Sequence, residues 1–110
     1  MTINEIGEAG VIVNTANGWE GFKPDDWPAN GERDKVHFLC THMALVHTEV
    51  AEATEAVRHR DRANFDEELA DVIIRVATIA RGLGIDLDIE VAKKLDKNSR
   101  RGLHHGGKAI

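Results

Sequence analysis

The sequence lacks the features of a membrane-bound or disulfide-stabilised protein. Its 110 residues include one cysteine, Cys40. A single cysteine excludes an internal disulfide framework and cannot by itself form a thiolate metal site, so we expect Cys40 to be a small buried apolar residue. No apolar run approaches the roughly 20 residues of a membrane span, and the first residues do not resemble a secretory signal. These absences predict a soluble, cytoplasmic protein.

Positive charge is also scarce. Lysine and arginine total 14 against 19 acidic residues, which gives a formal net charge of −5. Duplex nucleic acid is bound through clustered basic side chains, so this balance argues against a nucleic-acid partner. The net negative charge does not exclude a small anionic substrate that binds at one local basic patch. With 42% hydrophobic residues the chain can build one core, and we predict a single domain over residues 1–110.

The apolar periodicity predicts an all-α fold with a four-helix bundle-like protomer. The first helix should follow Thr2 as N-cap, with Glu5 completing a capping box, and end near residue 16. We expect the second helix over residues 33–58 and the third over residues 65–81, capped by Asn64. A fourth helix should begin after Asp86 or Asp88 and reach about residue 100.

Two stretches do not fit regular structure. Residues 17–31, the end of an N-terminal region 1–31, are rich in turn-forming residues around Trp19, Phe22 and Trp27. These aromatic side chains either plug the end of the helical bundle or offer a stacking surface for a planar base. The tail over residues 102–110 contains too much glycine for regular structure.

Apolar residues on the second and third helices indicate extensive helix packing. On the second helix they recur at alternating steps of three and four, at Val36, Leu39, Met43, Val46, Val50, Ala53 and Val57. On the third helix Ile74 lies away from the main apolar stripe. A second apolar face requires a cover, supplied by another copy in a homodimer or homotetramer, or by the first helix.

Two acidic pairs mark the candidate site. Glu49 and Glu52 are three residues apart on the second helix, and Glu68 and Asp71 are three apart on the third. Each pair points one way from its helix, and antiparallel packing would bring all four carboxylates together. Oxygen ligands without cysteine or paired histidine suit Mg²⁺ or Mn²⁺. The competing interpretations are an ordinary solvated acidic face and a di-iron centre, although the E-x-x-H motif of di-iron bundles is absent.

Other polar residues are weaker candidates. His37, His42 and His47 are spaced by five residues, which spreads them around the helix. This spacing favours core or surface histidines over metal ligands. On the fourth helix Lys94, Lys97, Asn98 and Arg101 gather on one flank. This flank is either a phosphate-binding patch or a solvated helix face.

The combination of these motifs resembles the MazG-like nucleoside triphosphate pyrophosphohydrolases. The E-x-x-E and E-x-x-D motifs, with 15 residues between Glu52 and Glu68, match that family's signature. The K-x-x-x-N-x-x-R pattern from Lys94 to Arg101 and the H-G-x-K ending from His105 to Lys108 resemble those of small, phage-type members. The resemblance covers residues about 36–108. Thr48 departs from it, since many members carry glutamate there, and we expect this difference to alter either the second metal position or the residues that surround the metal ligands.

The resemblance implies an all-α enzyme that hydrolyses the α–β bond of a (deoxy)nucleoside triphosphate with Mg²⁺, releasing the monophosphate and pyrophosphate. It implies that the four acids hold the metal and that a metal-bound or carboxylate-held water attacks phosphorus. Phosphate contacts would come from the fourth helix and tail, at Lys94, Lys97, Asn98, Arg101, His105 and Lys108. Base contacts would come from the aromatic loop or the first helix.

Two alternatives to a general pyrophosphohydrolase stay open at this point. One is a relative specialised for a single substrate, such as dUTP, dCTP or phosphoribosyl-ATP. The other is a non-catalytic, nucleotide-sensing dimerisation module that has kept the metal motif.

Overall fold

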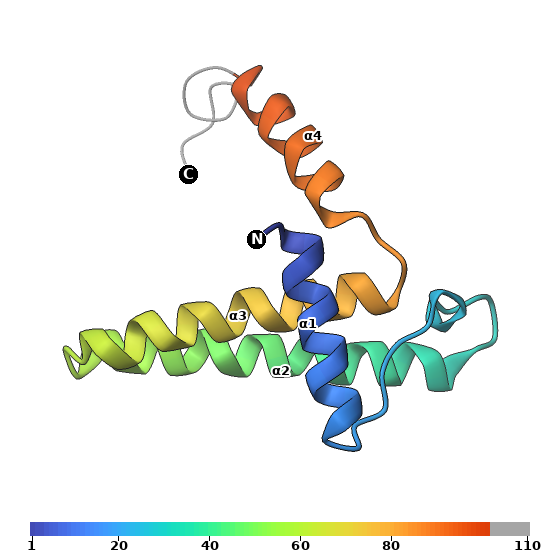
Figure 1. Cartoon of the computed structure of the whole chain (residues 1–110), viewed down its shortest axis with the longest axis horizontal. Coiled ribbons are helices and arrows are strands. Elements are labelled where there is room, and N and C mark those ends of the chain that lie inside the picture. Colours follow the sequence, from blue (N-terminus) through green and yellow to red (C-terminus); the bar gives the residue numbers. More distant parts are fainter. Residues whose placement is uncertain (102–110) are drawn as a thin grey trace.

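The computed structural model describes residues 1–101, and the regular structure within them is entirely helical. The elements are α1 (Ile3–Ala16), the short 3-10 helix η1 (Pro24–Asp26), α2 (Arg33–Arg58), α3 (Arg62–Gly82) and α4 (Leu87–Ser99). Helices α2 and α3 form an antiparallel hairpin, α1 crosses α3, and α4 extends away from the hairpin (Figure 1). The predicted all-α fold with four α-helices is confirmed for these residues. Among them, no helix combines the length and apolarity needed to cross a membrane.

Hydrogen bonds cap the first turns of α1 and α4, and others join the two helices to each other. The predicted capping box is present, with Glu5 N donating to Thr2 Oγ1 at 3.1 Å and Thr2 N donating to Glu5 Oε1 at 2.8 Å. Asp86 caps α4 by accepting from Ile89 N. Asp88, the other candidate cap, instead accepts from the backbone N–H groups of Ile3 and Asn4, each at 3.0 Å. These bonds satisfy donors that a helix start otherwise leaves unpaired and fix where α4 begins.

The α2–α3 turn corrects one predicted boundary. Helix α3 begins at Arg62 and not at Phe65, because Asp61 is the N-cap and accepts from Asn64 N at 3.0 Å. Arg60 adopts the left-handed conformation, with φ of 54°. The chain therefore reverses direction between α2 and α3 tightly enough for Asp61 to cap α3. The predicted end of α3 holds, since Gly84 takes the left-handed position with φ of 77°.

Small residues make the closest contacts between the helices. The buried apolar residues are Ala53, Ala56, Ala77 and Ala80. On α1, Gly7 and Gly10 are buried against α3, where a Cβ would collide with the Ala77 carbonyl and the Thr78 hydroxyl respectively. The glycines that weaken the helical pattern of α1 therefore allow its close approach to α3.

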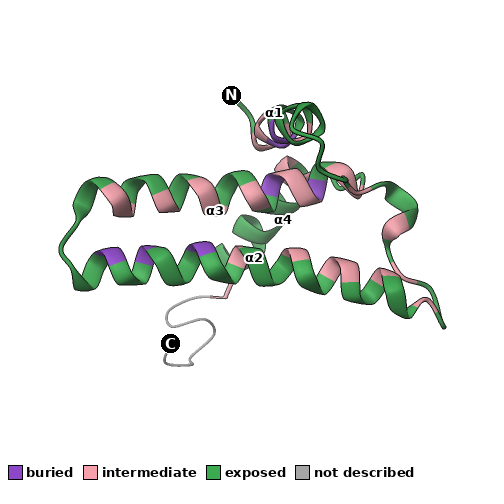
Figure 2. Cartoon of the chain, turned by 90° about the horizontal axis from the view of Figure 1, so that it is seen from below, coloured by how far each residue is buried: buried purple, intermediate pink, exposed green. Residues whose placement is uncertain are grey.

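The larger side chains of the predicted apolar seam are mostly not buried within one chain. Val50 and Val57 on α2 are 47% and 58% exposed, and Ile73 on α3 is 53% exposed. Exposed and intermediate positions dominate the ribbon in Figure 2. Cys40, expected in the core, is exposed. Ile74 borders a groove against α1 but is still 44% exposed, so α1 covers this face only in part.

Substituting Gly7 by alanine should destabilise the fold. A methyl group there meets the rigid backbone of Ala77, and overpacking of this kind costs about 1–3 kcal/mol, which outweighs the helix propensity that alanine adds. We expect urea denaturation to show a lower free energy of unfolding for Gly7→Ala. Gly21→Ala is the control, because a Cβ at Gly21 meets open space. Equal stability of the two variants would contradict the close α1–α3 packing.

Candidate active site

Three of the four predicted acidic residues converge between α2 and α3. Glu49 from α2 and Glu68 and Asp71 from α3 each offer a carboxylate oxygen, and these oxygens lie within 4.8 Å of one another. Glu49 is the one buried charged residue in the part of the chain that the structure describes, with 9% exposure. Glu52, the fourth acid, is exposed and is not one of these three residues, but it lies close enough to Glu68 to act on its pKa, in a separate, more open depression that both residues line.

Arg75 balances the buried charge of Glu49. Its Nε donates to Glu49 Oε1 at 2.9 Å, one helical turn beyond Asp71 on α3. This hydrogen bond lowers the pKa of Glu49 against the opposing effect of burial, so the carboxylate is held in its charged form.

The pKa of Glu68 shifts in the opposite direction to that of Glu49. Hydrogen bonding to Glu49, lost hydration and the nearby Glu52 carboxylate raise the pKa of Glu68 to about 7. Its Oε2 is buried and has no hydrogen-bond donor among the described residues. Ionised carboxylates only accept hydrogen bonds, so this oxygen needs either a proton or a cation. The donor set of hard oxygens with one unsatisfied atom fits a hard divalent cation.

A cavity of about 320 Å³ adjoins the acidic cluster. Along α2 it reaches from Glu49, which faces Asp71 and Arg75 of α3, to His42, which faces Phe22. Glu20 lines the cavity near His42, and α1 and the following loop form the remaining wall. The rings of Phe22 and His42 are 4.7 Å apart, and both pack against Phe38 at 4.8 Å. Burial lowers the pKa of His42 and the charge of Arg75 adds to the effect, against the opposing charge of Glu20, so the site favours the neutral imidazole. One cavity thus joins a charged end to an aromatic end.

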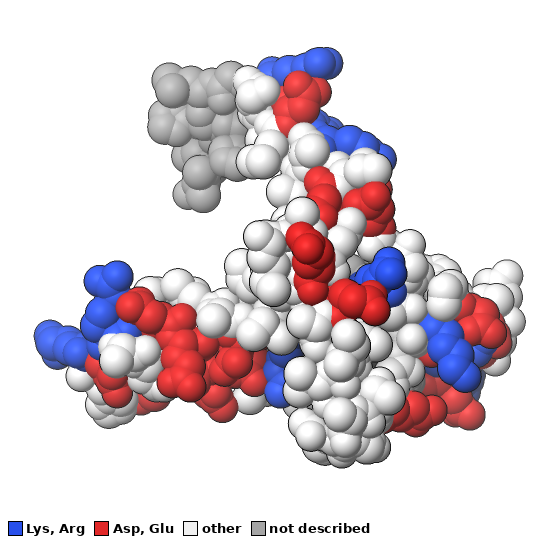
Figure 3. All heavy atoms as spheres, viewed as in Figure 1, with Lys and Arg blue, Asp and Glu red and all other residues white. Residues whose placement is uncertain are grey.

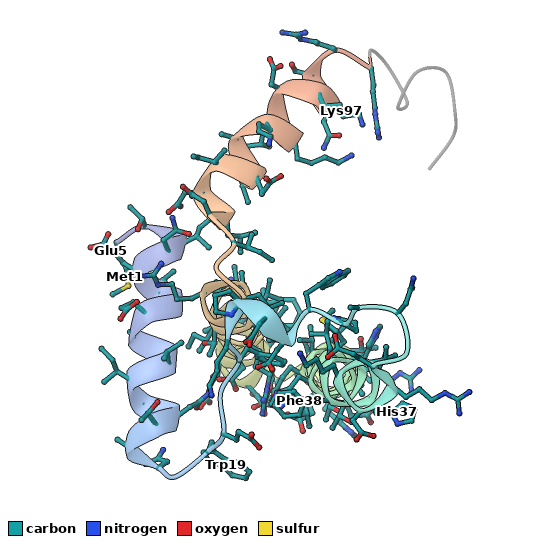
Figure 4. All side chains as sticks on the ribbon, turned by 90° about the vertical axis from the view of Figure 1, so that its right-hand side faces the viewer. Met1, Glu5, Trp19, His37, Phe38 and Lys97 are labelled. Carbon is teal, nitrogen blue, oxygen red and sulfur yellow. The ribbon has the colours of Figure 1, made fainter. Side chains whose placement is uncertain are left out.

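Of the three aromatic residues predicted to stack on a base, only Phe22 lines this cavity. Trp19 is 70% exposed and lies beside the bend after α1, outside the hairpin (Figure 4). Trp27 is 67% exposed and borders a different groove, between α2, α3 and the start of α4. The chain turns sharply between these positions, which places the three rings on different surfaces.

Among the described residues, the predicted phosphate-binding side chains of α4 do not meet the acidic cluster within one chain. Every residue from Ile89 to Arg100 is exposed, including Lys94, Lys97 and Asn98, and Arg101 follows the helix. Figure 4 places Lys97 toward the far end of α4, well away from the hairpin. In Figure 3 acidic side chains gather on the hairpin, whereas several basic ones follow α4. His105 and Lys108 lie outside the described residues.

Arg75 and His42 are among the cavity residues that were not singled out from the sequence as site residues. Arg75 carried a readable signal, because it is a charged residue in an apolar run, four positions after Asp71 and seven after Glu68 on the same helix face. His42 carried none, since its role depends on where the loop bearing Phe22 folds back onto α2.

The helical hairpin with clustered carboxylates beside a cavity defines a class of all-α proteins suited to binding a hard cation together with a small ligand. Comparison with known families makes the assignment specific: residues 39–105, more than half of the chain, match the MazG nucleotide pyrophosphohydrolase domain. The chain belongs to the MazG nucleotide pyrophosphohydrolase family. No curated protein and no solved structure matches it in the corresponding comparisons.

The raised pKa of Glu68 predicts how stability depends on pH without metal. Because the folded-state pKa of about 7 exceeds the ordinary value of 4.5, folding takes up a proton between these values. The resulting stabilisation is complete below pH 4.5 and is lost as pH rises through 7. Relative to Glu68→Gln, the wild type in EDTA should therefore show a fall in unfolding free energy from pH 5 to 8; the lowered pKa of His42 acts in the opposite sense in both proteins and cancels from this difference. Glu67→Gln, at an exposed neighbour, should retain the fall; identical pH profiles for the two variants would contradict this assignment.

Proposed function

We propose that this protein is a Mg²⁺-dependent nucleoside triphosphate pyrophosphohydrolase that converts (d)NTP to (d)NMP and pyrophosphate. One observation carries the proposal: in a member of the MazG family, Glu49, Glu68 and Asp71 converge, and two of them, Glu49 and Asp71, line a cavity that also contains the aromatic rings of Phe22 and His42. Mn²⁺ satisfies the same oxygen ligands and is the alternative ion. The single cysteine fits a reducing cytoplasmic setting, which is part of the proposal.

The acidic residues would bind the ion, orient the attacking water and accept its proton. Glu49, Glu68 and Asp71 would bind Mg²⁺, with Glu52 at the rim as the fourth ligand. When bound, the ion supplies positive charge that offsets the charge of the phosphate oxygens. A carboxylate of the cluster orients a water and accepts its proton as the water oxygen bonds to phosphorus. The α–β phosphoanhydride bond then breaks, and the monophosphate and pyrophosphate leave.

The aromatic end of the cavity would receive the nucleoside. A volume of about 320 Å³ is at the lower end of the range for small-molecule sites and suits one nucleoside. Phe22, backed by Phe38 and the neutral His42, offers a planar surface against which a base can pack. Trp19 and Trp27 do not line the cavity of their own chain. They could contact a base only in an assembly in which a second copy brings them to the cavity.

We further propose that the protein is a homodimer or homotetramer. Apolar side chains of α2 and α3 remain exposed around a groove lined by Val36, Met43, Val76 and Leu83, and a second copy would cover them. Helix α4 extends from the hairpin with its basic flank exposed, so in such an assembly it can reach another copy. Lys94, Lys97, Asn98 and Arg101 would then bind the phosphates of a substrate held at the neighbouring acidic cluster.

A pyrophosphate-release assay tests the activity. We expect turnover of nucleoside triphosphates with Mg²⁺, tested over a panel of NTPs and dNTPs. Glu49→Gln and Asp71→Asn should each lower kcat by about 100-fold or more, because each removes a charged ligand from the ion. Glu67→Gln is the matched control and should keep wild-type activity.

The same panel separates the alternatives. Turnover confined to one triphosphate would favour a substrate-specialised relative over a general pyrophosphohydrolase. Tight nucleotide binding without turnover of any substrate would overturn the enzymatic proposal in favour of a sensing module.

The oligomeric state is tested by light scattering after size exclusion. We expect the wild type to have at least twice the mass of one chain. Met43→Glu places a charge in the apolar groove and should give monomers, because a buried unpaired carboxylate opposes association. Thr41→Glu adds the same charge at an exposed position of α2 and should leave the assembly intact. A monomeric wild type would contradict the assembly and leave the chemistry to be tested separately.

A further inference from the structure

Arg75 is the one lysine or arginine among the residues that line the cavity beside the acidic cluster, within the part of the chain that the structure describes. The basic flank of α4 lies elsewhere in the same chain. A triphosphate brings several negative charges to a site that already contains three carboxylates. Arg75 is therefore the basic side chain that this cavity itself offers to a phosphate group.

The contacts of Arg75 leave most of its hydrogen-bonding capacity free. Its Nε donates to Glu49 Oε1, and this is the only hydrogen bond of Arg75 among the described residues. A guanidinium has five N–H donors in a planar fork that matches a phosphate group, so four donors remain. The side chain is 41% exposed, which leaves it accessible to a ligand in the cavity.

The position of Arg75 selects one phosphate of the substrate. His42 and Glu49 are seven residues apart on α2, which corresponds to about 10 Å along the helix. A nucleotide with its base at Phe22 and His42 and its phosphate chain at the carboxylates spans this distance. The α-phosphate is the group that joins the nucleoside to the rest of the chain. It therefore falls next to Arg75, which lines the cavity, contacts Glu49 through its Nε and is close enough for its charge to act on His42.

We propose that Arg75 binds the α-phosphate of the substrate directly while its Nε holds Glu49 in place. The inference rests on the proposed function and deepens it, because it assigns a substrate contact to a residue within the acidic hairpin. Arg81 provides the comparison. It lies further along α3, where its Nε donates to Glu8 at 2.6 Å, but it does not line the cavity.

Binding without metal separates a phosphate contact from a purely positioning role. The four 2′-deoxynucleoside monophosphates and their parent nucleosides are titrated calorimetrically in EDTA against the full chain. Arg75→Gln should weaken the tightest monophosphate by about tenfold or more, the size expected for losing a hydrogen bond to a charged group, and should change nucleoside affinity less than twofold. Arg75→Lys should keep part of the affinity, because it retains the charge but not the fork. Arg81→Gln should bind as the wild type does.

A second comparison guards against misfolding, because Arg75→Gln leaves the buried Glu49 carboxylate unpaired. Glu49→Gln/Arg75→Gln removes both charges, and it should bind the monophosphate about tenfold more weakly than Glu49→Gln alone. Unchanged monophosphate affinity in both Arg75 variants, with turnover lost, would overturn the phosphate contact and leave Arg75 as a positioning residue. A wild type that hydrolyses triphosphates but binds no monophosphate in EDTA would overturn it as well, with the proposed function intact.

Discussion

Repulsion among carboxylates at the α2–α3 contact is the constraint on which the rest of the site depends. The packing of α2 against α3 brings Glu49, Glu68 and Asp71 within 4.8 Å of one another. Three ionised groups at that separation require compensation. Arg75 supplies part of it at Glu49, and the raised pKa of Glu68 supplies another part by retaining a proton. A divalent cation would replace that proton, which is why the metal-free site is poised for one.

The N-terminal region determines the shape of the cavity next to these acids. Buried glycines on α1 allow it to lie against α3, and its first turn is joined to α4 through Asp88. Gly82 acts in the same way at the end of α3, because a Cβ there would crowd the Phe22 side chain at 2.7 Å. The loop after α1 can therefore return to α2 and place Phe22 beside His42. Contacts remote from the carboxylates thus decide what size of ligand can reach them.

One protomer leaves two surfaces that the proposed assembly would use. The apolar groove along α2 and α3 is exposed, and α4 carries its basic flank away from the acids of its own chain. A substrate with several phosphates needs more positive charge than Arg75 provides. Assembly through the apolar faces would satisfy both requirements together, since burying one surface can bring the other to a neighbouring site.

The sequence by itself determined the helical class, the limits of α2, the capping box of α1 and the two acidic pairs, because helical periodicity and capping are local properties of the chain. The start of α3 was predicted three residues late, since the left-handed Arg60 that lets Asp61 cap it is not evident from residue types. Only the tertiary structure decided that Glu52 sits at the rim, that Phe22 alone of the three aromatic residues reaches the cavity, and that Arg75 faces Glu49. These outcomes depend on interhelical distance and on the path of a loop, which arise when distant segments pack against each other.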